Sequence, residues 1–345
     1  MNDASESEKI FYNAVWNSTG CSHREIKKLK STAASWKEIF EKTKKSNVAT
    51  APEKDFEKLE KAGIKLILED EPDFPELLHE IYWSPFGIYV KGEINVLKKL
   101  CIAIVGTRKA TEDSVDIAGR FGSELARAGA TITSGLAFGI DSSVHKGCID
   151  AGGKTVAVLA CGLDGVYPKS NERLAREIIS SGGAIISEYP PGNPPLPYRF
   201  IERNRIISGV SGATIVIEAP ESSGSLTTAR FALDQNREVF VVPGPANHRN
   251  FSGSHRLIRS GARLVGKPSD VLEDLNIIES SVDDGDMTSE EKAVFEILKN
   301  SRNPLDIDKI SEIANLESRV ANQTVTLLLL KNLIKEEGEG YVSRK

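Results

Sequence analysis

Short apolar runs rich in β-branched residues alternate with helical stretches through the middle of the chain, and this alternation limits the fold more than any other feature. The runs occupy residues 102–106, 130–134, 155–161, 184–188, 213–219, 238–244 and 262–265. Most follow a helical stretch that ends in glycine, the residue that adopts the left-handed conformation past a helix end at least cost. Strands that are apolar on both faces and are separated by helices indicate a parallel sheet covered on both sides. We therefore predict an α/β fold with an extended Rossmann-like, doubly wound, mostly parallel sheet.

The flanks of this region differ from it in composition and predict further domains. Residues 1–85 are rich in Lys and Glu, which predicts a small N-terminal helical domain and a lead-in to a Rossmann-like domain at 86–278. The acidic stretch 279–287 has the composition of a linker. A capping box then runs from Thr288 to Glu291, and the pattern after it predicts a helix, a helix-turn-helix and a hairpin. This order predicts a C-terminal winged helix at 288–345.

Overall charge and cysteine usage exclude several classes of protein. The 345-residue chain has a net charge of −5, so no global basic field indicates nucleic acid or membrane. Residues 199–259 nevertheless contain eight Arg, no Lys and five acids, which favours a local anion site. The cysteines Cys21, Cys101, Cys148 and Cys161 form no CxxC pair, so we expect reduced thiols. The chain shows no signal-like N-terminus and no apolar run of about 18 residues, so we expect a soluble, cytoplasmic protein without membrane contact.

Two glycine-containing loops follow predicted strands and have the character of anion sites. Residues 134–141 read SGLAFGID, a turn between a strand and a helix that would offer backbone N–H groups of Ser134, Gly135 and Gly139 to a phosphate. Asp141 at this helix start is alternatively a plain N-cap. His145 has no second ligand at metal spacing, so we predict no metal. The second loop contains Ser223, Gly224 and Ser225 and also opens a helix.

Two basic residues follow other strands and could face the same edge of the sheet. The turn Gly106-Thr107-Arg108 lacks the GxGxxG pattern, and the second strand ends in Ser134 rather than in an acid, so we expect no NAD(P) and no other cofactor. Arg108 offers a forked donor to a phosphate, or alternatively pairs with a nearby acid on the surface. Lys169 follows a rigid Tyr-Pro turn and is either aimed at the same edge or simply solvated.

The most basic motif is the segment 200–208, which contains Arg203, Asn204 and Arg205. We expect the isoleucines at 206 and 207 to be buried, which leaves the two arginines in a cluster with Arg199 that suits a polyanion. A salt-bridge network with the acids at 188 and 202 is the alternative. The chain contains no Ser/His/Asp triad motif, no Walker loop and no HExxH motif, and Glu218 at a strand end has no evident catalytic partner. We therefore predict a protein that is not an enzyme.

Taken together, these motifs resemble the DNA-processing protein A (DprA/Smf) family of bacteria. The matching segments are GTR at 106–108, SGLAFGID at 134–141, GGKTVAVLACGLDGVYP at 152–168, SEYPPG at 187–192, RNRIIS at 203–208, and the stretch from SGSLTTA to VPGP at 223–246. Thr107 replaces the serine usual in the first turn and keeps its hydroxyl. Ile201 stands where proline commonly follows the phenylalanine, so the local turn can differ.

The resemblance implies a non-catalytic protein that binds single-stranded DNA, protects incoming DNA and helps to load the RecA recombinase in natural transformation and recombination. It also implies a homodimer formed through the Rossmann domain, with single-strand-binding protein as a further partner. On this hypothesis the phosphates contact Arg108, Lys169, Arg203 and Arg205, and the glycine loops donate N–H groups. The alternatives are a nucleoside monophosphate phosphoribohydrolase, whose PGGxGTxxE loop has no counterpart here, and a sensor of a soluble nucleotide.

Overall fold

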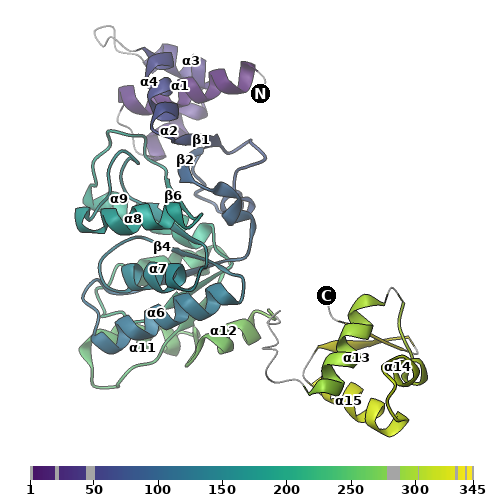
Figure 1. The fold of residues 1–345 in the computed structure, drawn as a ribbon. Coiled ribbons are helices and arrows are strands. Elements are labelled where there is room, and N and C mark those ends of the chain that lie inside the picture. The colour runs from purple at the N-terminus through teal and green to yellow at the C-terminus, as the bar shows by residue number, and fades with distance from the viewer. Residues whose placement is uncertain are drawn as a thin grey trace. The chain divides into compact units, whose positions relative to one another are not determined.

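A computed structural model describes residues 3–19, 23–43, 51–277, 288–301, 303–330, 333–338 and 340–343 (Figure 1). It divides into two compact units, Met1–Val271 and Leu272–Lys345. The predicted acidic linker at 279–287 lies outside the described residues, as does Cys21. The division into four parts stays a prediction. No helix among the described residues combines the length and the apolar character needed to cross a bilayer.

The first unit is built on a nine-stranded sheet with the order β1-β2-β6-β5-β4-β3-β7-β8-β9. All seven predicted strands are present and mutually parallel, which confirms the predicted fold class. They are β3 (Cys101–Val105), β4 (Thr131–Ser134), β5 (Thr155–Leu159), β6 (Ala184–Ser187), β7 (Ala213–Val216), β8 (Glu238–Val241) and β9 (Arg263–Leu264).

Two antiparallel strands, β1 (Lys65–Leu68) and β2 (Gly87–Gly92), extend the sheet next to β6. The sheet therefore begins well before residue 86, where the sequence predicted the Rossmann-like domain to start. The run 65–68 is only four residues long, and its identity as a strand depends on pairing with β2 rather than on its own pattern.

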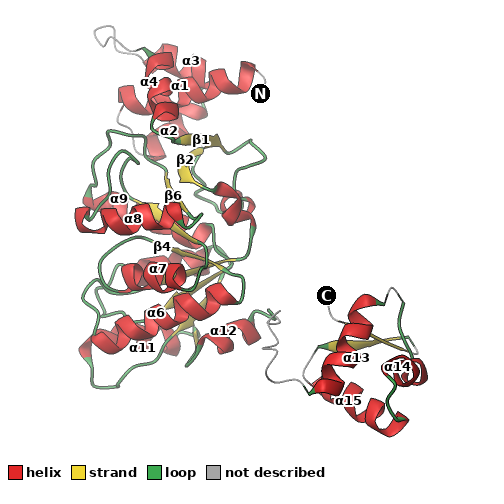
Figure 2. Ribbon diagram, in the orientation of Figure 1, coloured by secondary structure: helices red, strands yellow, loops and turns green. Residues whose placement is uncertain are grey.

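Helices cover both faces of this sheet (Figure 2). The N-terminal helices are α1 (Asp3–Thr19), α2 (His23–Lys30), α3 (Trp36–Thr43), α4 (Pro52–Lys61) and α5 (Glu76–His79), and the 3-10 helix η1 (Ile94–Lys98) precedes β3. The crossover and following helices are α6 (Glu112–Arg127), α7 (Ile140–Asp150), η2 (Lys169–Asn171), α8 (Glu172–Ser180), α9 (Pro197–Gly209), α10 (Ser225–Asp234), η3 (Arg249–Phe251), α11 (Ser252–Arg259) and α12 (Pro268–Asp274).

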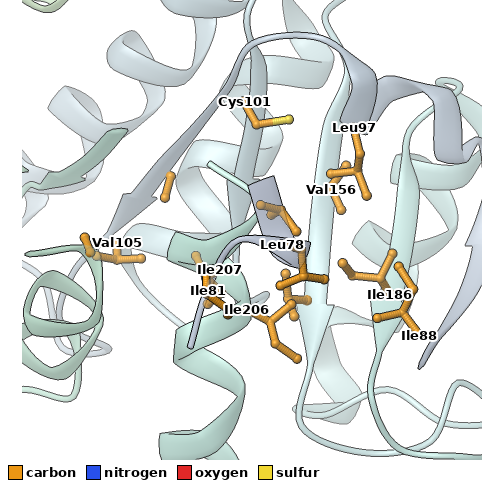
Figure 3. Packing of buried hydrophobic residues seen from close by; sticks show 14 of the residues in the cluster. Leu78, Ile81, Ile88, Leu97, Cys101, Val105, Val156, Ile186, Ile206 and Ile207 are labelled. Carbon is orange, nitrogen blue, oxygen red and sulfur yellow. The ribbon is translucent and has the colours of Figure 1, made fainter. Parts of the chain in front are cut away.

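Neighbouring residues of one strand enter two separate hydrophobic clusters, because side chains alternate between the faces of a sheet. On β5, Val156 and Val158 pack with Ile206 and Ile207 of α9 (Figure 3). Residues 157 and 159 of the same strand belong to the other cluster, which includes Ile178 of α8 and the side chains of the N-terminal helices. Burial on both sides explains why these strands read as unbroken apolar runs in the sequence.

The sheet order reverses between β3 and β7: β4, β5 and β6 follow on one side of β3, and β7, β8 and β9 on the other. At such a reversal the loops that leave the two central strands diverge, and open α/β sheets bind ligands in the crevice that results. The turn at 106–108 and the residue Glu218 both lie just past these strand ends.

The described residues from 288 onward form helices and a hairpin in the order predicted from the sequence: α13 (Ser289–Asn300), α14 (Ile307–Ala314), α15 (Ser318–Leu330), β10 (Ile334–Glu337) and β11 (Gly340–Ser343). The capping box is present, with Thr288 and Glu291 each bonding the backbone N–H of the other. Val294, Ile310 and Leu328 lie in the hydrophobic cluster of these elements. The identification as a winged helix stays a prediction.

Candidate nucleic-acid interface

The loops singled out in the sequence follow β3, β4, β5 and β7, so they lie at the carboxyl edge of the parallel sheet. Helix α9 links several of them through its side chains. Arg203 donates a hydrogen bond from Nη1 to the Gly135 carbonyl at 2.8 Å, and Asn204 donates from Nδ2 to the Gly224 carbonyl at 3.2 Å. The structure thus brings together loops that are far apart in the sequence.

Phe200 on the same helix is the centre of a group of aromatic and cationic side chains. Its ring centroid lies 5.2 Å from the Arg108 guanidinium carbon and 6.0 Å from that of Arg203. The Tyr167 ring meets it edge-on, with centroids 5.3 Å apart. We call Arg108, Tyr167, Phe200 and Arg203 the Phe200 cluster. Arg108 is exposed, Tyr167 is 46% exposed and Phe200 is half-buried, so cation and rings face solvent together.

Phe200 begins the basic segment 200–208, but the sequence pattern alone predicted no role for it. The spacing from Phe200 to Arg203 and Asn204, three and four residues later, could have predicted that Phe200 belongs to the same site. Residues at this spacing share one face of a helix. A second aromatic residue, Phe138, lies in the loop after β4 and is half exposed.

Arg203 is buried, contrary to the prediction of a solvent-facing arginine cluster. Its residue exposure is 4%, and its Nη1 also donates to the carbonyl of Val158. Burial lowers the pKa of Arg203 to about 10, although the nearby Asp141 acts in the opposite direction. Because the guanidinium bonds to backbone carbonyls, Arg203 holds the loop after β4 in place.

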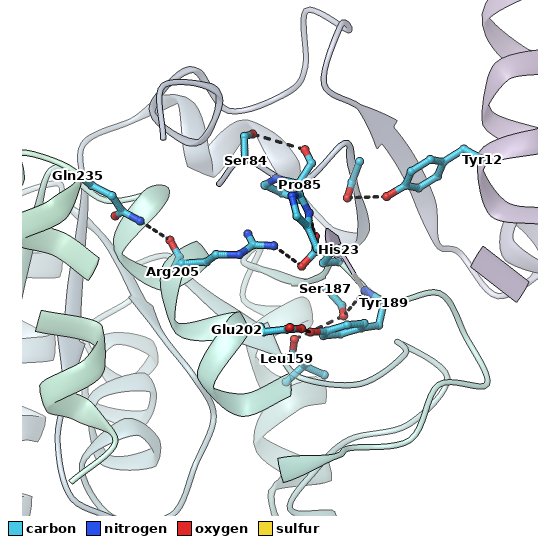
Figure 4. A network of polar contacts seen from close by, with 12 residues as sticks. Tyr12, His23, Ser84, Pro85, Leu159, Ser187, Tyr189, Glu202, Arg205 and Gln235 are labelled. Carbon is cyan, nitrogen blue, oxygen red and sulfur yellow. Dashed lines mark hydrogen bonds and ion pairs between the residues drawn. The ribbon is translucent and has the colours of Figure 1, made fainter. Parts of the chain in front are cut away.

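Arg205 is also misplaced by the sequence prediction, because it is fully buried. Its Nη2 pairs with Glu188 at 2.5 Å, an ion pair drawn as a dashed line from Arg205 in Figure 4. Its guanidinium lies 4.6 Å from the centroid of the Trp83 ring. His23 bonds the other oxygen of Glu188 at 2.9 Å. Two residues apart on a helix differ by about 200° around its axis, so Arg203 and Arg205 cannot share a face. Arg205 therefore forms a buried salt bridge with Glu188, which was the alternative to an arginine cluster that binds a polyanion.

Arg199 lies one helical turn before Arg203 and is also buried. It donates to the Pro194 carbonyl at 2.8 Å and to Asn193 Oδ1 at 2.9 Å. None of the three arginines predicted as a cluster therefore presents its charge to solvent.

The loop at 134–141 uses the Gly135 N–H, one of the groups predicted to face a phosphate, in an internal hydrogen bond. Asp141 Oδ2 accepts hydrogen bonds from the backbone N–H of Gly135 at 3.1 Å and of Ala137 at 3.3 Å. Ser134 is fully buried, and its hydroxyl donates to the Ile104 carbonyl at 2.6 Å. Burial raises the pKa of Asp141, while Arg203 and the N–H donors oppose that rise. Asp141 therefore closes the loop internally and takes the place predicted for a phosphate.

The glycines of these loops permit close approach of other protein groups. A Cβ at Gly139, where φ is +72°, would lie 2.5 Å from the Thr107 carbonyl oxygen. A Cβ at Gly106 would lie 2.4 Å from a side-chain carbon of Ile140, and one at Gly135 would lie 2.7 Å from the Arg203 guanidinium. Glycine is therefore required at these positions because other parts of the protein pack against their backbone.

Thr107 and Glu218 shape the turn that carries Arg108. The Thr107 N–H donates to the Glu218 carbonyl at 2.7 Å, and its hydroxyl accepts from the Lys109 N–H at 3.2 Å. The Glu218 carboxylate accepts from the Thr111 N–H at 3.0 Å, from the Thr111 hydroxyl at 2.7 Å and from Asn250 Nδ2 at 2.5 Å. Burial would raise the pKa of Glu218, but hydrogen bonds from Ser114, Thr111 and Asn250 outweigh it and lower the pKa. Glu218 is thus a buried acceptor at the point where the sheet order reverses.

The loop before α10 keeps part of its predicted character. The Ser223 hydroxyl lies 2.7 Å from that of Ser225 and accepts the Ser225 N–H at 3.3 Å, so these groups bond each other. Gly224 is the N-cap of α10 and is exposed, and a Cβ built there would meet no atom within 4 Å. The N–H groups of residues 225–228 already have acceptors within the protein, so the exposed backbone of Gly224 is the part of this loop that stays accessible.

Lys169 is exposed on η2, in a different part of this edge. Asn171, two residues later, donates to the Leu136 carbonyl at 2.9 Å and so ties η2 to the loop after β4. Within the part of the chain that the structure describes, neither Lys169 nor Arg108 forms an ion pair. These two residues are the predicted cationic contacts whose charge faces solvent.

No cluster of three metal-ligating side chains occurs among the described residues. His145 is fully buried in α7, bonds the Thr155 hydroxyl at 2.7 Å, and has a pKa lowered to about 3 by burial and by Arg203. A doubly wound α/β protein with an exposed arginine and aromatic rings at its carboxyl edge is the class that this geometry defines.

The chain belongs to the family described as DNA recombination-mediator protein A, whose sequence profile matches residues 65–276. This finding confirms the family predicted from the motifs. Protein Smf of Escherichia coli is 43% identical over 217 residues, which cover 63% of this chain and 58% of that protein. The chain therefore matches somewhat more than half the length of this curated relative.

Two solved structures are similar to a large part of this chain. The crystal structure of DNA processing protein A (DprA) from Streptococcus pneumoniae has 32% identity and a TM-score of 0.65, and the match covers 77% of this chain and 97% of that one. DNA processing protein A from Helicobacter pylori, described for its unique single-stranded DNA binding mode, has 29% identity and a TM-score of 0.56. That match covers 62% of this chain and 95% of that one.

Proposed function

We propose that this chain binds single-stranded DNA along the carboxyl edge of its sheet without catalysing a reaction on it. The observation that carries the proposal is the Phe200 cluster, in which the Phe200 ring lies next to both the exposed Arg108 and the ring of Tyr167. Proteins that bind single strands without sequence preference combine cations for the backbone with aromatic faces for the bases. The single-stranded DNA binding described for the Helicobacter pylori relative supports the same function here.

The contact set differs from the one predicted by sequence alone. Arg108 and Lys169 contact phosphates, Tyr167 and Phe200 stack on bases, and the exposed Gly224 offers its own N–H just before α10. The other predicted residues keep these groups in position through the bonds described above: Gly106, Thr107, Ser134, Gly135, Gly139, Arg203, Asn204, Ser223 and Ser225. Arg205 acts in the core.

Binding of the strand is the first step of a wider role that we propose from the family. The chain acts in the cytoplasm as a homodimer, protects incoming DNA, and helps to load RecA during natural transformation and recombination, with single-strand-binding protein as a further partner. The description of the family as a recombination mediator supports this role. Its test is the rate of RecA filament formation on DNA coated with single-strand-binding protein, with and without this chain. A rate that the chain leaves unchanged would overturn the proposal of loading.

Fluorescence anisotropy with a labelled single-stranded oligonucleotide tests the contact set. Each phosphate contact on a single strand contributes about 0.7 to the slope of log affinity against log salt. Arg108→Ala and Lys169→Ala should therefore weaken binding and each reduce that slope by about 0.7. Arg127→Ala is the matched control, because Arg127 is an exposed arginine at the end of α6, which returns to the opposite edge of the sheet. Equal slopes for all three variants would refute the assignment.

Two measurements separate DNA binding from the alternative functions. Release of adenine from AMP in the presence of the chain would identify a phosphoribohydrolase. Displacement of a bound oligonucleotide by mononucleotides at similar concentration would identify a nucleotide sensor. We expect neither, because the Phe200 cluster joins an exposed arginine to aromatic rings at the sheet edge, which suits a strand of several nucleotides.

A further inference from the structure

A groove of about 480 Å³ runs along α8 and is separate from the Phe200 cluster. Its walls come from α8, from the loop that leads to η2, and from strands β5, β6 and β2. Half of the lining residues have apolar side chains, including Leu159, Val166, Ile179 and Ile185. We call this space the α8 groove. Its size falls within the range of roughly 300–1,000 Å³ typical of sites for small organic ligands.

Cations outnumber acids in the α8 groove. Lys91, Lys169 and Arg176 line it together with Asp164 and Glu172. Arg176 pairs with Glu172 at 3.0 Å, and one oxygen of Asp164 accepts the Gly192 N–H at 2.9 Å. Among the described residues, neither Lys91 nor Lys169 has an acidic partner. Once the Arg176–Glu172 pair is set aside, the two lysines stand against Asp164 alone, so the charge balance of the groove stays positive and favours an anionic ligand.

The groove is continuous along the chain with the proposed DNA site. Val166 lines the groove, the next residue Tyr167 contacts Phe200, and Lys169 lines the groove again. A strand held at Phe200 can therefore pass over this turn and reach the groove. Apolar walls with lysines beside them match a nucleotide, which has a flat base and a charged phosphate.

We propose that the α8 groove takes one unstacked nucleotide of the bound strand, with its base against the apolar walls and its phosphate at Lys91 and Lys169. This inference rests on the proposed function, because the nucleotide belongs to the single strand held at the Phe200 cluster. It adds Lys91 to the contact set, a residue that lies on β2 and outside every motif recognised in the sequence.

Substitutions at Gly165 can place a negative or a positive charge in the α8 groove and so test whether an anion binds there. It lines the groove, is exposed, and a Cβ built there meets no atom within 4 Å, so a side chain fits without a clash. Gly165→Glu should weaken oligonucleotide binding, and Gly165→Lys should strengthen it. Lys91→Met, which removes the charge and keeps the stem, should weaken binding and reduce the salt slope by about 0.7. Lys65→Met is the control, since Lys65 is an exposed lysine on the neighbouring strand β1.

The outcomes distinguish this inference from the proposed function. If wild type binds the oligonucleotide and Arg108→Ala weakens it, but both Gly165 variants and Lys91→Met bind like wild type, the α8 groove holds no nucleotide and the proposed function stands. If wild type itself does not bind single-stranded DNA, the proposed function fails and the inference fails with it. Opposite effects of the two Gly165 variants, together with the lower slope for Lys91→Met, support the inference.

Discussion

Replacing Arg205 with methionine tests whether this arginine belongs to the core or to the DNA site. Methionine keeps most of the side-chain length but removes the charge, so Glu188 keeps only His23 as a partner, at 2.9 Å. Glu188 is 1% exposed. Removing one member of a buried ion pair costs about 3–5 kcal/mol, because the other charge stays buried without compensation. The cation–π contact with Trp83 is lost as well.

The assay is unfolding followed by tryptophan fluorescence, with DNA binding measured on the folded variant at low temperature. A loss of that size should lower the midpoint of thermal unfolding by roughly 10 °C, since about 2–4 °C corresponds to 1 kcal/mol in domains of 150–250 residues. Affinity for single-stranded DNA should stay at the wild-type value. The double variant Arg205→Met with Glu188→Gln should recover part of the lost stability, because it removes the uncompensated charge.

The pH dependence gives an independent check on this ion pair. Burial alone would raise the pKa of Glu188, but Arg205 and His23 outweigh it and hold the pKa below the ordinary value of 4.5. A carboxyl group with a pKa lowered by folding stabilises the fold above its unfolded pKa, and this contribution is lost as the pH falls through the folded value. The stability difference between wild type and Arg205→Met should therefore narrow below pH 4.5. A variant with wild-type stability and lost DNA binding would refute the reasoning.

Two further substitutions test how the edge loops are held. Gly139→Ala should lower the free energy of unfolding by more than Gly129→Ala. At φ 72° and ψ −123°, Gly139 has a conformation that glycine alone adopts readily, and a Cβ there would lie 2.5 Å from the Thr107 carbonyl oxygen, whereas a Cβ at Gly129 meets no atom within 4 Å. Equal losses in urea unfolding would contradict the close-approach argument. Glu218→Gln should lower the free energy of unfolding by about 1–3 kcal/mol, because the new amide NH2 group faces the N–H donors of Thr111 and Asn250 instead of accepting from both. It should also speed amide hydrogen exchange at 106–111, and unchanged exchange rates there would show that Glu218 does not hold the turn.

The sequence determined the architecture because the residue pattern of each strand shows how many of its faces are buried. Apolar runs mark strands covered on both faces, glycines mark helix ends, and a loop that follows a parallel strand must lie at its carboxyl edge. Seven strands, the order of the C-terminal elements and the edge that carries Arg108 could all be predicted in this way. β1 could not, since a four-residue strand is identified only by its partner.

The tertiary structure decided which polar groups remain available for a ligand. Arg203 bonds a carbonyl 68 positions away in the sequence, and His23 reaches Glu188 across 165 positions. Local patterns carry no information about such partners, so they could not show that the loop at 134–141 is closed by Asp141 or that Arg205 is buried. Burial of apolar side chains is non-directional, so the pattern of apolar residues along the chain is enough to predict it. A hydrogen bond needs two particular atoms in a fixed geometry, and only the folded chain brings them together.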